Sequence, residues 1–84
     1  MPKQQSNNLV GGRVRIARRN LRPALTQDAL SGRLAKIGVT LDRAGIAKIE
    51  AGVRFVSDYE IRALCEVLAV SPSWLLGMSK PERS

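Results

Sequence analysis

One signal for starting a helix recurs four times along this chain. In each case a residue with a short polar side chain follows an apolar residue, and another apolar residue comes four places later. The polar oxygen can accept a hydrogen bond from a free N–H of the first helical turn, and the two apolar side chains can pack together beside it. The four capping positions are Thr26, Asp42, Ser57 and Ser71. This repetition predicts a chain built of helices.

Neighbouring residues strengthen several of these signals. Glu60 lies three residues after Ser57, which gives a capping box. Pro72 follows the Ser71 cap at the first helical position, where its missing N–H costs nothing. Gly52 and Gly77 are placed to end the third and fifth helices.

An earlier helix carries no such cap and is predicted from its apolar spacing. Four apolar residues recur at steps of four, three and four, namely Val10, Val14, Ala17 and Leu21. They form one stripe of an amphipathic helix, which Pro23 ends. The predicted helices therefore span 9–21, 26–37, 42–51, 57–69 and 72–76. No strand alternation competes with them, so we expect an all-α fold, a compact five-helix bundle.

The length of 84 residues suffices for one small domain. We expect the helical domain to occupy residues 9–77. The polar segment 1–8 has no apolar periodicity and is predicted to be a flexible N-terminal arm, with a flexible tail over 78–84.

Positive charge is concentrated in the first two-thirds of the chain. The formal net charge is +7, and residues 1–54 hold 11 basic and 3 acidic residues, against 3 and 4 in residues 55–84. Five arginines fall within ten residues: Arg13, Arg15, Arg18, Arg19 and Arg22. Such a run is either a solvated helix face or the contact surface for a polyanion, and both interpretations stay open at this point.

Composition also excludes several classes of site. There is no His and a single cysteine, Cys65, so no Cys/His metal cluster, Cys–His nucleophile pair or internal disulfide can form. The sequence has no long apolar run for a membrane span and no apolar core of a signal peptide. We expect a cytoplasmic protein that is not an enzyme, binds no cofactor, metal or small-molecule ligand, and does not contact a membrane. Cys65 is expected to be a core residue.

The second and third predicted helices, joined by a turn carrying Gly38, have the organisation of a helix-turn-helix. Ile46 and Ile49 point to the core. The opposite face consists of small residues and two cations: Arg43, Ala44, Ala47, Lys48 and Ala51. A flat, cationic face of this kind favours close approach to a large anion such as the DNA major groove. The alternative explanation is that alanine simply favours helix formation.

The chain resembles the Xre/Cro-type, phage-repressor-like helix-turn-helix domains over about residues 9–77. The residues that carry the resemblance are GGRVRIARR, LTQDAL, IAKIEAG and IRALCEVLAVSPSWLLG. The resemblance implies a lambda-repressor-like bundle whose helix-turn-helix is formed by helices 26–37 and 42–51. It also implies sequence-specific binding of double-stranded DNA by a small prokaryotic or phage transcriptional regulator, which reads the major groove with helix 42–51.

The same resemblance implies individual roles. The residues matching base-reading positions are Arg43, Ala44 and Lys48. The residues matching phosphate-contacting positions are Arg13, Gln27 and Arg54. Arg18 and Glu50 match an ion pair that joins the first helix to the third, so Glu50→Ala should mainly destabilise the fold.

The sequence departs from the family at two places. The stretch AKIGVTLD makes the link between the second and third helices longer than is usual, so either the second helix gains a turn or the loop grows. Gly45 lies inside a helix, where glycine is unfavourable, and is expected to permit close contact with another helix or with DNA.

A protein-interaction module, such as an antitoxin or adaptor, is the alternative function. Its helices 57–69 and 72–76 would bind a protein partner through exposed apolar residues at Tyr59, Trp74, Leu76 and Met78. For Trp74 and Leu76, closure of the core is the competing interpretation. The resemblance further implies a homodimer through the C-terminal helices.

Overall fold

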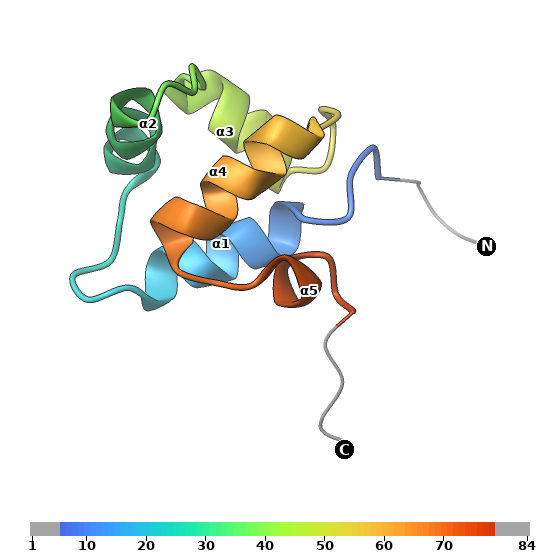
Figure 1. Cartoon of the computed structure of the whole chain (residues 1–84). Coiled ribbons are helices and arrows are strands. Elements are labelled where there is room, and N and C mark those ends of the chain that lie inside the picture. Colours follow the sequence, from blue (N-terminus) through green and yellow to red (C-terminus); the bar gives the residue numbers. More distant parts are fainter. Residues whose placement is uncertain (1–5, 79–84) are drawn as a thin grey trace.

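The computed structural model describes residues 6–78 and folds them into five helices packed around one core (Figure 1). The helices are α1 (Gly11–Asn20), α2 (Gln27–Lys36), α3 (Arg43–Glu50), α4 (Asp58–Leu68) and α5 (Pro72–Leu75). No strand is present among these residues, and each helix begins and ends within two residues of its predicted bounds. The all-α prediction is confirmed.

All four predicted caps form. Thr26, Asp42, Ser57 and Ser71 each accept a hydrogen bond from the N–H three residues further on, over 2.7–3.2 Å. Glu60 completes the capping box, because its Oε1 accepts from the Ser57 N–H at 3.0 Å. The local signal in the sequence therefore sets where α2 to α5 begin.

Helix α1 is capped by the side chain of Asn8, three residues before the first helical residue, Gly11. The Asn8 Oδ1 atom accepts from the N–H groups of Val10 at 3.0 Å and Gly11 at 2.7 Å. The Nδ2 atom of the same side chain donates to the carbonyl oxygens of Ile49 at 3.1 Å and Arg54 at 2.9 Å. One amide thus caps α1 and ties it to the end of α3 and to the loop that follows.

This arrangement involves residues 6–8 of the segment 1–8 that was expected to be a flexible arm. Residues 6–8 lie against the loop after α3, where the Asn7 N–H donates to the Gly52 carbonyl at 2.7 Å. At the other end, the Met78 N–H, at the first residue of the expected tail, donates to the Ser73 carbonyl at 2.7 Å. Residues 1–5 and 79–84 lie outside the described residues.

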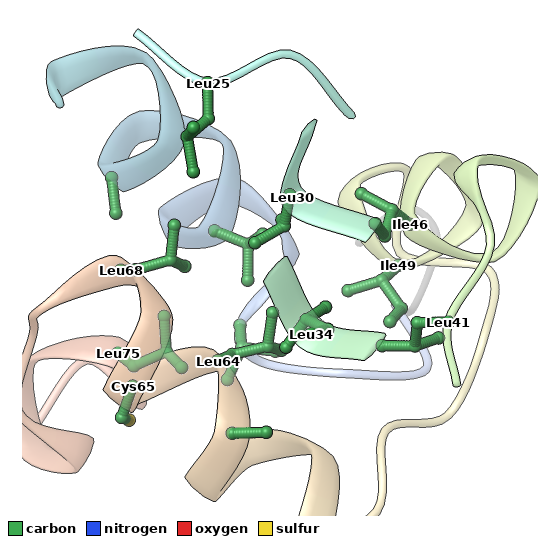
Figure 2. Close-up of a cluster of buried hydrophobic side chains, with 14 residues drawn as sticks. Leu25, Leu30, Leu34, Leu41, Ile46, Ile49, Leu64, Cys65, Leu68 and Leu75 are labelled. Atoms are coloured by element: carbon green, nitrogen blue, oxygen red, sulfur yellow. The ribbon is translucent and has the colours of Figure 1, made fainter. Parts of the chain in front are cut away.

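The core draws side chains from all five helices and from the two connections around α2. The largest fully buried residues are Val10, Val14, Leu30, Leu34, Ile46, Ile49, Leu64, Leu68 and Leu75. Figure 2 shows Leu30 and Leu34 of α2 between Ile46 and Ile49 of α3 and Leu64 of α4. Cys65 is also buried there, as predicted, and its burial raises the pKa of its thiol.

The long link between α2 and α3 grows as a loop and adds no turn to α2. Gly38 ends the helix with a φ of 87°, a left-handed conformation that glycine adopts without a Cβ clash. The loop is held at its far end, where the Ser31 hydroxyl donates to the Leu41 carbonyl at 2.6 Å and the Leu41 side chain is buried. These contacts give α3 a fixed starting point despite the longer link.

Helix α1 packs against the end of α3 at a glycine. A Cβ atom added to Gly11 would overlap the Ile49 carbonyl oxygen and lie 3.1 Å from that of Glu50. A Cβ atom added to the adjacent Gly12 meets nothing within 4 Å. Of these two glycines, only Gly11 is therefore needed for the close approach of the two helices.

We predict opposite effects of the same substitution at these two glycines. Gly11→Ala should lower the free energy of unfolding by about 1–3 kcal/mol, because the backbones must separate. Gly12→Ala should raise it by about 0.5–1 kcal/mol, because alanine is the better helix former. Urea unfolding followed by circular dichroism measures both changes. Equal changes in the free energy of unfolding would contradict the close approach of α1 and α3 at Gly11.

Candidate functional site

The outward face of α3 carries the three residues matched to base reading. Arg43, Ala44 and Lys48 are all exposed, whereas Ile46 and Ile49 on the opposite side are each 1% exposed. The periodicity of a helix places three small residues, Ala44, Ala47 and Ala51, on one arc. Arg43 lies at one margin of this arc and Lys48 at the other. The face is thus a flat strip with a cation on either side.

A solvent-open hollow of about 470 Å³ lies beside this strip, between α1, α2 and α3. Its lining comes from α1 (Arg15, Arg18 and Arg19), from the start of α2 (Thr26 and Gln27) and from the end of α3 (Ala47, Glu50 and Ala51). Ala47 and Ala51 are short, which leaves the space in front of α1 unfilled.

The ion pair between Arg18 and Glu50 forms as expected and lies in this hollow. The Arg18 Nε atom donates to Glu50 Oε2 at 2.7 Å and its Nη2 atom donates to Oε1 at 2.8 Å, with side-chain exposures of only 10% and 6%. Hydrogen bonding to Glu50 raises the pKa of the Arg18 guanidinium. Arg18 also donates to the Leu25 carbonyl at 3.0 Å, and the Gln27 amide donates to Glu50 Oε1 at 3.2 Å. The Glu50 carboxylate is therefore compensated from both α1 and α2.

Arg13 lies away from the hollow. Its guanidinium carbon is 4.9 Å from the centroid of the Trp74 ring, which is the geometry of a cation–π contact. Two residues along a helix correspond to about 200° of rotation, so Arg13 and Arg15 point to opposite sides of α1. The structure thus groups Arg13 with α5 and not with the other residues matched to phosphate contacts.

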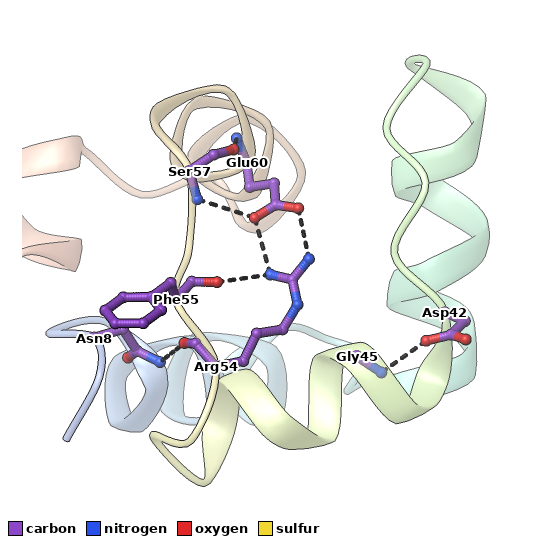
Figure 3. A network of polar contacts seen from close by, with 7 residues as sticks. All are labelled: Asn8, Asp42, Gly45, Arg54, Phe55, Ser57 and Glu60. Atoms are coloured by element: carbon purple, nitrogen blue, oxygen red, sulfur yellow. Dashed lines mark hydrogen bonds and ion pairs between the residues drawn. The ribbon is translucent and has the colours of Figure 1, made fainter.

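Arg54 is bound to the start of α4 (Figure 3). Its Nη1 and Nη2 atoms donate to Glu60 Oε1 and Oε2, each at 2.9 Å, and Nη1 also donates to the Phe55 carbonyl at 2.9 Å. This hydrogen bonding holds the pKa of Glu60 below its usual range and raises that of Arg54. Arg54 therefore extends the capping box of α4. Of the three residues matched to phosphate contacts, only Gln27 lines the hollow.

Arg43 has one weak anionic neighbour. Its Nη1 atom is 3.9 Å from Asp28 Oδ2, and both side chains are about 70% exposed, at 68% and 72%. An exposed pair at this separation contributes little, so Arg43 remains able to reorient toward a ligand.

Gly45 has its close neighbours at the start of its own helix. An added Cβ would lie 3.1 Å from Asp42 Oδ1 and 3.3 Å from Leu41 Cδ2. Within the fold, the close contact is therefore with the cap of α3, to which the Gly45 N–H donates at 2.7 Å, and the contact expected with another helix is not found among the described residues.

No role was predicted from the sequence for the cations of Arg15 and Arg19 or for the side-chain amide of Asn8. Arg15 and Arg19 are four residues apart on the side of α1 that carries Arg18, so the predicted pairing of Arg18 with Glu50 already implied that both lie beside α3. Asn8 is a capping residue type close to the start of the first helix, and its position could have been read as a cap.

Residues 6–78 contain no group of three or more His, Cys, Asp or Glu side chains placed to hold a metal ion. None of their helices has the length and apolar character that crossing a membrane requires.

No protein-family model matches the chain, and neither the curated proteins nor the solved structures gave a match.

We predict that Arg18 and Glu50 are strongly coupled in stability. Glu50→Ala should lower the free energy of unfolding by about 3 kcal/mol, because it leaves a buried guanidinium without its partner. The double variant Arg18→Met/Glu50→Met should be more stable than Glu50→Ala, because no buried charge remains. Urea unfolding of both variants tests this coupling, and a double variant less stable than Glu50→Ala would contradict it.

A second prediction concerns the pH dependence of stability. Because the pKa of Glu60 is lower in the fold than in the unfolded chain, its contribution is complete above the unfolded value of about 4.3 and is lost as the pH falls through the folded value. Glu60→Gln should cost about 2 kcal/mol at pH 7. It should also show a shallower loss of stability on acidification than the unchanged protein.

The matched control for Glu60 is Glu66→Gln, an exposed position on the same helix. Thermal unfolding measured from pH 7 to pH 3 should give this variant the pH dependence of the unchanged protein. Identical pH profiles for the Glu60 and Glu66 variants would show that the contact with Arg54 does not lower the pKa of Glu60.

Proposed function

We propose that this chain binds double-stranded DNA sequence-specifically, as a small prokaryotic or phage transcriptional regulator of the cytoplasm. In this proposal α2 and α3 are the helix-turn-helix of a lambda-repressor-like bundle, and α3 lies in the major groove. The observation that carries it is the outward face of α3, a flat alanine strip between the exposed cations Arg43 and Lys48. A helix with such a face can enter a groove without steric obstruction and meets negative potential there.

Base reading is assigned to the margins of the strip. Arg43 and Lys48 can each donate to guanine O6 and N7, and the Ala44 methyl can contact a thymine methyl. Gln27, at the positive N-terminal end of α2, is assigned to a backbone phosphate. Arg13 and Arg54 are left out of this assignment, because their guanidinium groups contact Trp74 and Glu60 away from the hollow that Gln27 lines.

The decisive measurement is selection of bound duplexes from a random pool, followed by affinity against salt concentration. The logarithm of the binding constant should fall linearly with that of the salt concentration, with a slope of about −0.9 for each phosphate contacted. Arg43→Ala should cost about 1–3 kcal/mol and relax the preference at one base pair. The control Arg33→Ala, at an exposed position near the end of α2, should leave the selected sequence unchanged.

Two outcomes would contradict the proposal. Binding that does not respond to salt would exclude a phosphate-dominated interface. An Arg43→Ala variant that weakens all sequences evenly would exclude base reading by Arg43.

A protein-interaction module remains the second candidate, because one part of the surface is apolar. Tyr59 and Met78 are 77% and 67% exposed as expected, whereas Trp74 and Leu76 are partly buried against the core. Leu9 and Phe55, exposed by 78% and 75%, border a small apolar hollow of about 160 Å³. Such a surface suits a protein partner or a second copy of the chain. The number of chains bound per selected duplex tests the homodimer.

A further inference from the structure

Arg15 and Arg19 are the least engaged cations beside α3. Both side chains are exposed, and neither takes part in an ion pair within residues 6–78. They lie one turn apart on α1, on the side that carries Arg18. Each therefore keeps its guanidinium group available to a ligand in front of the hollow.

The hollow itself is cationic. Three guanidinium groups and one carboxylate line it, and the carboxylate is that of Glu50, which already accepts from Arg18 and Gln27. The α3 side is open because Ala47 and Ala51 are short. An anion entering between α1 and α3 thus meets free donors from Arg15 and Arg19 and a carboxylate whose charge is balanced.

We propose that Arg15 and Arg19 jointly bind one backbone phosphate of duplex DNA at this hollow, and that this contact sets the register of α3 in the groove. The inference rests on the DNA-binding function proposed above and names the residues that position the duplex. Arginine suits the task, because its planar group presents two parallel donors to phosphate oxygens.

The fold makes such a contact effective as an anchor. Helix α1 is fixed to α3 by the Arg18–Glu50 pair, by the Asn8 side chain and by the close approach at Gly11. A phosphate bound to α1 is therefore held at a constant position relative to the strip on α3. A contact of this kind positions the duplex but carries no sequence information.

The test compares two double variants with the same net charge. Arg15→Gln/Arg19→Gln removes the proposed anchor, whereas Arg33→Gln/Arg62→Gln removes two exposed arginines of α2 and α4 that line other surface hollows. On the selected duplex the first variant should have a salt slope smaller by about 0.9, because one phosphate contact is lost. The selected sequence should stay the same, and the control should keep a slope close to that of the unchanged protein.

A second measurement locates the phosphate. Duplexes are made with a single phosphate at a time replaced by an uncharged methylphosphonate, and affinity is measured for each. For the unchanged protein several positions should weaken binding. For Arg15→Gln/Arg19→Gln one of these positions should no longer matter, because the contact it reports is already missing.

The outcomes separate this inference from the function on which it rests. If the unchanged protein binds no duplex, both proposals fail. If it binds and the two double variants lower the salt slope equally, DNA binding stands and the Arg15/Arg19 anchor is overturned. The anchor is also overturned if both proteins give the same methylphosphonate profile while inorganic phosphate stabilises only the unchanged protein against heat. That result would assign the hollow to a free phosphate group.

Discussion

The contact between Arg18 and Glu50 joins every element that borders the candidate surface. Its guanidinium comes from α1 and its carboxylate from α3, while Arg18 also holds the Leu25 carbonyl ahead of α2 and Glu50 accepts from Gln27 inside α2. Both side chains are almost fully shielded from water. A shielded charge is tolerated only with its partner in place, so the three helices can adopt this arrangement together but not separately.

Local and long-range contacts differ in how far the sequence reveals them. A cap such as Thr26 or Ser57 involves an oxygen and an N–H three residues away, so residue type and spacing suffice to predict it. The contacts of Arg13 with Trp74 and of Asn8 with Arg54 join residues far apart in the chain. No local pattern encodes such contacts, and the resemblance that matched Arg13 and Arg54 to phosphate contacts does not reveal that Trp74 and Glu60 engage their guanidinium groups. The longer loop before α3 was visible in the sequence, but its attachment through Ser31 and Leu41 was not.

Charge and apolar exposure are divided between different parts of the surface. The α1 cations Arg15, Arg18 and Arg19 line the larger hollow, whereas the exposed apolar side chains of Leu9 and Phe55 border the smaller one. The Arg54–Glu60 pair belongs to the second part and is neutral as a unit. A protein divided in this way can approach a polyanion with one surface while the other meets a protein, so the two candidate functions do not compete for the same residues.

The double use of the Asn8 amide has a consequence for how the fold opens. The terminal turn of an isolated helix frays readily, because its last carbonyl groups have no partners within the helix. At the end of α3, the Ile49 carbonyl is held by the same side chain that caps the start of α1. Fraying of α3 at this end therefore removes a hydrogen bond from the side chain that caps α1, so we expect the two helix ends to open together.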